Sequence, residues 1–242
     1  MPLAEGKRLF ATTQWSVVLA AGDIDRHEAR IALAQLCEAY WYPLYAYVRR
    51  RVDNVHEAQD LTQAFFAHLL EKQAIARANH DRGRFRDFLV TALRNFLSNE
   101  WEKARAEKRG AGKTPLSLDF DSGESRYKIE PSHELTAERL YERRWVLTLL
   151  DQVLESLRIE LAEAGNAEHF EQLKATLAGE ATVADYDRVA EALGISSAAA
   201  KQAAYRMRKR YRQLFREEVA RTVAHEAEVD DEIGRLLATL GG

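Results

Sequence analysis

Residues 186–212 read YDRVAEALGISSAAAKQAAYRMRKRYR, and this stretch decides the fold expected for the second half of the chain. Apolar side chains recur in its first part every three or four residues, at Tyr186, Val189, Ala190 and Leu193. This spacing predicts a short amphipathic helix that ends at Gly194. Ser196 or Ser197 can cap the next helix, so a short turn joins two helices. This order is the pattern of a helix-turn-helix.

The second of these helices is strongly basic. Between Ser196 and Arg216 the chain has seven basic residues and no acidic one: Lys201, Arg206, Arg208, Lys209, Arg210, Arg212 and Arg216. On a helical projection, one stripe holds Lys201, Tyr205, Arg208 and Arg212, and a different side holds Ala200, Ala204, Met207, Tyr211 and Leu214. We expect the apolar side to pack and the basic stripe to face a polyanion. A solvated helix in a bundle is the alternative, although like charges four residues apart destabilise a helix by about 0.2–0.5 kcal/mol per pair.

The net charge of the chain hides this basic block. In total, 35 Lys and Arg stand against 38 Asp and Glu, which leaves a formal charge of −3. Residues 217–242 carry seven acidic and two basic residues, so an acidic segment directly follows the basic helix. One hypothesis is that this segment folds back and shields the basic helix. The alternative is a capping helix without regulatory effect.

Composition favours an all-α protein and excludes several classes. Only 12 Gly and 4 Pro occur in 242 residues, and no useful segment alternates with the period of a strand. The single cysteine, Cys37, cannot form an internal disulfide, which indicates a reducing, cytoplasmic compartment. No apolar run fits a secretory signal or a membrane span. No nucleophile motif, phosphate loop or metal-ligand spacing occurs, so we expect no enzyme, metal or cofactor.

Changes in composition divide the chain into five parts. The segment 106–137 holds two of the prolines, three glycines and no helical apolar period, which indicates a linker. The predicted parts are an N-terminal arm (1–24), a helical domain (25–105), the linker (106–137), a second helical domain (138–216) and an acidic extension (217–242).

Two helices of the front domain have faces of different chemistry. In the first, Ala58, Leu61, Phe65 and Leu69 are the expected buried stripe, and Glu57, Asp60, Gln63 and Glu71 form an acidic and polar ridge opposite. In the second, Phe85, Phe88, Ala92 and Phe96 are expected in the core, with Arg94, Ser98, Trp101 and Arg105 roughly opposite. Spacing alone favours ordinary solvated surface for the ridge. Basic residues beside an exposed indole suit phosphate contact and base stacking.

Three stretches, taken together, resemble a known family. They are DLTQAFFAHLL (60–70), DRGRFRDFLVTALRNFL (81–97) and the stretch 186–212 quoted above. In this order, with a linker before the third, they resemble regions two and four of extracytoplasmic-function sigma factors, the small two-domain members of the sigma-70 family. The resemblance covers most of residues 28–105 and 138–216. It implies a region-two helical bundle and a region-four helix-turn-helix domain, with N- and C-terminal extensions.

The resemblance implies a dissociable subunit of bacterial RNA polymerase that directs promoter recognition and melting. Its partners would be core RNA polymerase and promoter DNA. The chain would bind polymerase through the clamp of the largest subunit and through the flap. The resemblance leaves open whether an anti-sigma factor also binds. The residues assigned to core polymerase are Asp60, Gln63 and Glu71. Those assigned to the minus-ten element are Asn79, His80, Arg84, Arg94, Asn95, Trp101 and Arg105. Those assigned to the minus-35 element are Lys201, Gln202, Tyr205, Arg206, Arg208, Lys209 and Arg212.

A second interpretation assigns the chain to a different class of protein. A conventional helix-turn-helix transcriptional regulator, whose front domain senses a signal or dimerises, would also carry a basic recognition helix. Such a regulator would bind duplex operator DNA without polymerase, whereas small sigma factors bind DNA poorly alone. A footprint by the free protein distinguishes the two interpretations.

Overall fold

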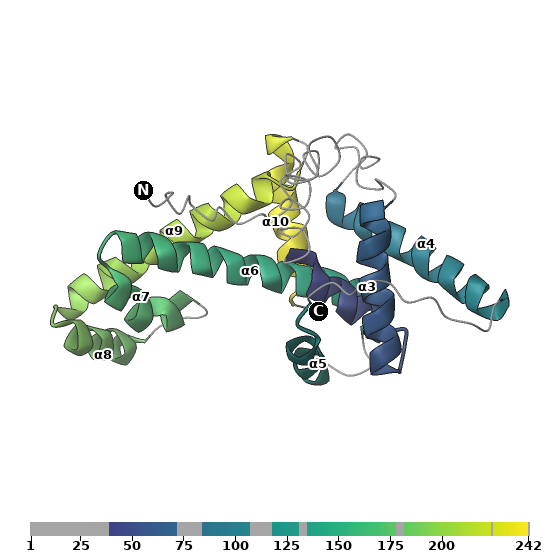
Figure 1. Cartoon of the computed structure of the whole chain (residues 1–242). Coiled ribbons are helices and arrows are strands. Elements are labelled where there is room, and N and C mark those ends of the chain that lie inside the picture. The colour runs from purple at the N-terminus through teal and green to yellow at the C-terminus, as the bar shows by residue number, and fades with distance from the viewer. Residues whose placement is uncertain are drawn as a thin grey trace, which may run out of the picture. The chain divides into compact units, whose positions relative to one another are not determined.

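The computed structural model describes residues 39–71, 84–106, 118–130, 135–177, 182–223 and 225–241. Within these ranges every regular element is a helix (Figure 1), which confirms the predicted all-helical class for this part of the chain. The chain divides into two compact units. We call the described residues of 11–148 and 219–242 the front unit, and those of 149–218 the rear unit.

The front unit is built from helices that come from both ends of the chain. They are the helical residues 39–49, α3 (Val55–Glu71), α4 (Phe85–Ala106), α5 (Phe120–Lys128), the first part of α6 (Ala137–Glu163), η4 (Glu226–Glu228) and α10 (Val229–Ala238). Helices α3 and α4 lie side by side (Figure 1), with the rings of Phe65 and Phe96 5.6 Å apart between centroids. Aromatic contacts thus join the two helices that carry the predicted functional faces.

Burial confirms most of the faces predicted for α3 and α4. On α3, Ala58, Phe65 and Leu69 are buried, while Leu61 is half-buried. Thr62 is also buried, which the apolar spacing did not predict, and its hydroxyl donates to the Ala58 carbonyl at 2.7 Å inside the core. On α4 the predicted Phe85 and Phe96 are buried and Phe88 and Ala92 are half-buried, and the rest of the core face is Leu89, Leu93 and Leu97.

Residues 39–49 carry three tyrosines whose hydroxyls donate to glutamates from later in the chain. The pairs are Tyr45 with Glu124 at 2.7 Å, Tyr42 with Glu130 at 2.9 Å and Tyr47 with Glu138 at 3.0 Å. Each carboxylate also meets an arginine: Arg49 with Glu124 at 3.0 Å, Arg51 with Glu138 at 2.6 Å, and Arg144 with Glu130. We call these contacts the three Tyr–Glu–Arg sets. Hydrogen bonds to charged groups contribute about 1.5–3 kcal/mol each. The sets therefore connect α5, Glu130 and the start of α6 to this helix.

The structure differs from the predicted linker over 106–137. Part of this segment forms α5, and Gly123 of α5 lies so close to Trp41 that an added Cβ would be 2.8 Å from the indole ring. The described residues 118–130 are therefore folded as part of the front unit. The division between the units falls at Thr148, inside α6. An apolar period did not reveal α5, because it is held by the ring contacts of Phe120 with Trp41 and Tyr45 and by the polar contacts of Glu124, not by a regular apolar stripe.

The chain after α9 (Ser197–Ala220) also belongs to the front unit. Its buried residues include Val223, Val229 and Leu236, and Glu232 is completely buried among them. The carboxylate of Glu232 is paired with arginines at the start of α4. The acidic segment 217–242 thus contributes to the front unit a helix with one buried side, which holds Val229, Glu232 and Leu236.

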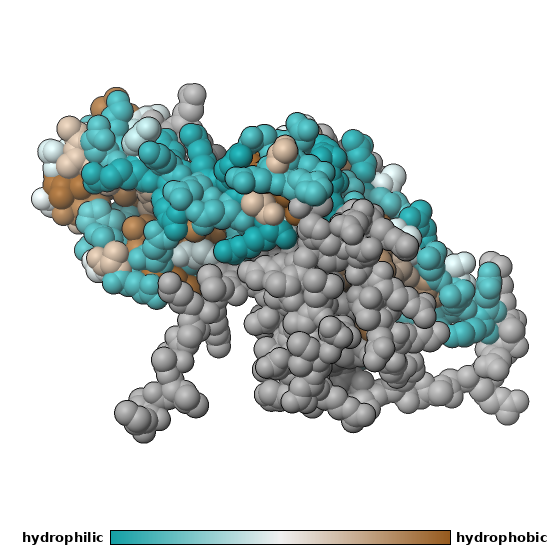
Figure 2. Space-filling view, turned by 90° about the horizontal axis from the view of Figure 1, so that it is seen from above, coloured by the Kyte–Doolittle hydropathy of each residue, from teal (hydrophilic) through white to brown (hydrophobic). Residues whose placement is uncertain are grey.

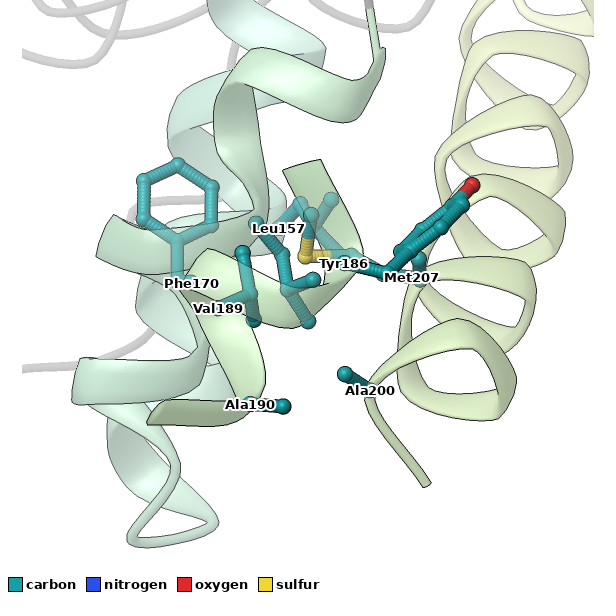
Figure 3. Packing of buried hydrophobic residues seen from close by; sticks show 9 residues of the cluster. Leu157, Phe170, Tyr186, Val189, Ala190, Ala200 and Met207 are labelled. Atoms are coloured by element: carbon teal, nitrogen blue, oxygen red, sulfur yellow. The ribbon is translucent and has the colours of Figure 1, made fainter. Parts of the chain in front are cut away.

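The rear unit has its own core. Its elements are the second part of α6, α7 (Ala167–Leu173), η3 (Lys174–Leu177), α8 (Val183–Leu193) and most of α9. The buried cluster that they share is Leu157, Phe170, Leu173, Tyr186, Val189, Ala190, Ala200, Ala204 and Met207 (Figure 3). Leu157 of this cluster comes from α6, Phe170 and Leu173 come from α7, and the alanines come from α8 and α9, so one core joins the four helices.

A substitution at Gly123 tests the close contact of α5. We expect Gly123→Val to lower the free energy of unfolding by about 1–3 kcal/mol, because the new side chain overlaps the Trp41 ring. Gly234→Ala in α10 is the matched control: its Cβ meets nothing within 4 Å, and alanine should stabilise a helix by about 0.5–1 kcal/mol. Urea denaturation followed by circular dichroism measures both. Equal effects of the two variants would contradict the packing of α5.

The pH dependence of stability tests the Tyr–Glu–Arg set at Glu124. The hydrogen bond from Arg49 lowers the pKa of Glu124 below its ordinary value of 4.5, against the opposing effect of burial. A carboxyl with a lowered folded-state pKa stabilises the protein above pH 4.5 and loses this contribution as the pH falls through the folded-state pKa. Glu124→Gln should cost about 1–3 kcal/mol at pH 7.

The difference between wild type and Glu124→Gln should shrink as the pH falls below 4.5, in urea titrations at a series of pH values. Glu155→Gln is the control, since Glu155 forms a comparable pair with Arg158 at 2.6 Å on the surface. It should change stability little at any pH. A pH-independent difference for Glu124→Gln would argue against a charged Glu124 in the fold.

Candidate functional site

The turn between α8 and α9 is fixed by local hydrogen bonds. Thr182 and Asp185 form a capping box at the start of α8, and Gly194 ends the helix with a left-handed φ of 63°. The Ile195 N–H donates to the Ala190 carbonyl at 3.0 Å, which closes the helix end. The Ser196 hydroxyl then accepts the Ala199 N–H at 3.2 Å. Ser196 is therefore the cap of α9, and the two helices are joined as the sequence predicted.

The apolar side predicted for α9 faces the core of the rear unit. Ala200, Ala204 and Met207 are buried in it, and Tyr211 and Leu214 pack against it from the edge. The Tyr211 hydroxyl donates to the Leu150 carbonyl at 3.3 Å, and burial raises its pKa to about 12. This packing fixes which side of α9 is left for solvent.

The opposite side of α9 is an exposed basic surface. We define it by its exposed members, Lys201, Gln202, Tyr205, Arg206, Lys209 and Arg212. Tyr205 is 60% exposed, which is unusual for a large aromatic side chain. Among the residues that the structure describes, none forms an ion pair or side-chain hydrogen bond with Lys201, Arg206, Lys209 or Arg212. The four cations are thus available to a ligand.

Two arginines of the basic block are engaged within the rear unit. Arg208 is half-buried and donates to the Tyr186 hydroxyl at 3.0 Å. Arg210 pairs with Glu160 of α6 at 2.8 Å and with Glu217 at 3.4 Å. The hydrogen bond with Glu160 raises the pKa of Arg210. The sequence assigned Arg208 to DNA, but its guanidinium already holds α9 against α8.

The predicted polymerase-binding residues lie on the exposed side of α3. Asp60 is exposed and Gln63 is half-buried, on the same side as the exposed Glu57. In the described ranges no side chain pairs with Asp60. The side chain of Glu71 lies outside the described residues. The ridge that the structure describes is therefore Glu57, Asp60 and Gln63.

The predicted minus-ten residues fall into three groups. Arg94 and Asn95 are exposed on α4, as expected. Trp101, expected to expose its indole, is half-buried. Asn79, His80 and the side chain of Arg105 lie outside the described residues.

Arg84, the remaining minus-ten residue, has a partner that the sequence analysis did not foresee. Its Nη2 lies 2.7 Å from Glu232 Oε2 of α10, and Arg86 pairs with the other oxygen of this carboxylate. Arg86 is buried and stacks on Trp145 at 4.6 Å from the ring centroid. Burial lowers the pKa of Arg84, and the neighbouring Arg86 adds to this effect. One sequence signal was present: Glu232 falls on the apolar stripe of α10, between Val229 and Leu236.

The described part of the chain offers little for metal or membrane chemistry. Within it, no group of three or more His, Cys, Asp or Glu side chains could hold a metal ion. None of the helices in these ranges combines the length and apolarity that crossing a bilayer requires. Hydrophilic residues cover most of the described surface seen in Figure 2, with hydrophobic residues in separate smaller areas.

These features define a helical protein with an acidic ridge in one unit and a basic helix in the other. Comparison with protein families adds a closer assignment: residues 36–107 match the family model for Sigma-70 region 2. A sigma-70 region 2 is therefore present in the front unit, and the match supports a member of the sigma-70 family. Comparisons with curated proteins and with solved structures give no match.

The turn glycine can be tested by substitution. An added Cβ at Gly194 meets nothing within 4 Å, so the strain of a φ of 63° is the main effect of Gly194→Ala. We expect a loss of about 1–2 kcal/mol in the free energy of unfolding. Gly194→Asn should lose less, because asparagine tolerates this backbone region. Urea denaturation of both variants gives the order of their stabilities. An alanine variant as stable as wild type would contradict the turn geometry.

Proposed function

We propose that this protein is a sigma factor that binds core RNA polymerase and directs promoter recognition and melting. The observation that carries the proposal is the match of residues 36–107 to sigma-70 region 2. Further support comes from a later unit in which a capped helix presents unpaired cations. The extracytoplasmic-function group, with extensions at both ends, is our proposed subtype, and the cytoplasm is the proposed compartment.

In this proposal the front unit binds polymerase through α3. Asp60 and Gln63 would dock on the clamp of the largest subunit, with Glu71 further along the same helix. Asp60 suits this role because it is exposed and has no partner in the described residues. A carboxylate that is unpaired in the free protein gains a cationic partner without first breaking an internal ion pair.

The front unit would also hold the minus-ten element. Asn79 and His80 would contact an extruded base, and Arg84, Arg94, Asn95, Trp101 and Arg105 would contact the same DNA. Extruding a base costs a few kcal/mol of stacking and pairing, and a pocket that binds only the extruded base offsets this cost. Promoter melting of this kind needs no catalytic residue, metal or cofactor.

The rear unit would read the minus-35 element with α9. The first turns of a recognition helix usually meet base edges, so Lys201, Gln202 and Tyr205 are the proposed base contacts. Arg206, Lys209 and Arg212 would contact phosphates, where a cation adds affinity but little sequence information. Arg208 would act indirectly in this proposal, by holding α9 on α8 through Tyr186. The polymerase flap is the proposed docking place of this unit.

Reconstituted transcription tests the proposal directly. Core polymerase with the protein should give run-off transcripts from a subset of a genomic promoter library, and core alone should not. Asp60→Ala and Gln63→Ala should lower core binding and transcript yield at least several-fold, whereas Glu168→Ala, an exposed carboxylate of α7, should leave both unchanged.

Variants on the basic surface of α9 test the role of the rear unit separately from that of the front unit. Lys201→Ala should reduce transcription at promoters with a minus-35 element while core binding stays normal, and Lys174→Ala is the matched control in the rear unit. Absence of core binding at low salt would overturn the proposal. A duplex footprint by the free protein would favour the conventional regulator instead.

A further inference from the structure

The most unusual buried group of the front unit is the carboxylate of Glu232. It is 0% exposed, and three arginines surround it: Arg84 at 2.7 Å, Arg235 at 3.5 Å, and Arg86. Arg84 and Arg86 come from the start of α4, whereas Glu232 comes from α10 near the other end of the sequence. Asp87, which lies 3.8 Å from Arg84 and 3.9 Å from Arg86, is half-exposed. The cluster therefore has more cations than anions.

One arginine of this cluster, Arg86, has contacts besides the one with Glu232. The Arg86 guanidinium stacks on Trp145, and the backbone carbonyl of Arg86 accepts the Tyr141 hydroxyl at 3.1 Å. Arg86 is only 6% exposed, and its Nη1 has no hydrogen-bond partner in the part of the chain that the structure describes. The guanidinium is thus oriented with one donor unused. An anion with more oxygens than a carboxylate could use this donor.

A leucine at position 232 would continue the apolar stripe of α10 without the loss of hydration that a buried carboxylate suffers. Buried ion pairs are often no more stabilising than apolar residues of similar size. Glu232 alone, however, cannot be replaced in this way without removing the buried counter-charge of Arg86, so its charge both compensates Arg86 and directs α10 to the arginines at the start of α4.

We propose that Arg84 and Arg86 form a phosphate-binding site of the front unit, and that Glu232 of α10 occupies this site in the free protein. A phosphate of single-stranded DNA takes the place of the carboxylate when α10 leaves. The identity of this DNA as the opened minus-ten region rests on the proposed function. The proposal that Glu232 keeps an anion away from these arginines does not rest on the proposed function.

Release of α10 is physically accessible. The helix spans only Val229–Ala238, and isolated helices of this length are marginal in water. Arg84 has 23% of its side chain exposed, so a ligand can approach one arginine before the carboxylate is displaced. The incoming anion would replace Glu232 as the counter-charge of the buried Arg86, so Arg86 is paired before and after the exchange.

Binding of a labelled single-stranded 20-mer to the full chain, without polymerase, tests the proposal. Glu232→Gln keeps the shape of the side chain and removes its charge, and we expect at least tenfold tighter binding. The salt dependence should steepen by about 0.7 in slope, as for one added phosphate contact on a single strand. Combining Glu232→Gln with Arg84→Ala should remove the gain.

Glu228→Gln is the matched control, because it changes the net charge equally at an exposed position just before α10. Equal tightening by Glu228→Gln and Glu232→Gln, or no tightening by either, would overturn the proposal. Circular dichroism and urea denaturation verify that the variants are folded.

Hydrogen exchange of the wild-type chain gives a second test that needs no variant. Saturating 20-mer should speed amide exchange in α10 and leave α3 unchanged; unchanged protection of α10 would overturn the proposal. Inorganic phosphate alone, in a parallel experiment, tells whether any phosphate suffices or a nucleic-acid strand is required. If the 20-mer displaces α10 but no promoter-dependent transcription occurs, the anion site stands and the sigma function falls.

Discussion

A carboxylate that leaves water needs a cation or a hydroxyl in its place, and the front unit is arranged around this constraint. Glu124, Glu130 and Glu138 meet tyrosines of the helix at 39–49, each with an arginine beside it. Glu232 meets the arginines of α4. Segments that follow the matched region 2 are thereby fixed to it by directional polar contacts rather than by apolar packing alone.

The parts of the fold that depend on local order were predictable from sequence. The capped turn at Gly194 and the buried alanines of α9 follow from hydroxyl, glycine and apolar spacing within about one turn of helix. The stripe of α3 was predicted for the same reason. Thr62 was not predicted to be buried, because a polar side chain is expected in water, whereas its hydroxyl donates a hydrogen bond to a carbonyl of its own helix.

Long-range pairings were not predictable in the same way. Nothing near Glu124 in sequence indicates Tyr45 as its partner, and Arg84 gives no sign of Glu232. Charge patterns suggested where a polyanion could bind, but they did not tell which cations the protein itself uses. Arg208 and Arg210 look like Lys209 in sequence, yet their contacts with Tyr186 and Glu160 give them structural roles. The role of each cation in a basic block therefore depends on contacts that the spacing of residues in the sequence does not show.

The pairing of Arg84 with Glu232 also has a consequence for biosynthesis. A ribosome adds about 5–20 residues per second, so Glu232 is made roughly 7–30 s after Arg84. Throughout this interval the nascent front unit lacks the helix that covers its arginines. A growing chain therefore carries Arg84 and Arg86 without Glu232, and their guanidinium groups are available to ribosomal RNA or to a chaperone before the protein is complete.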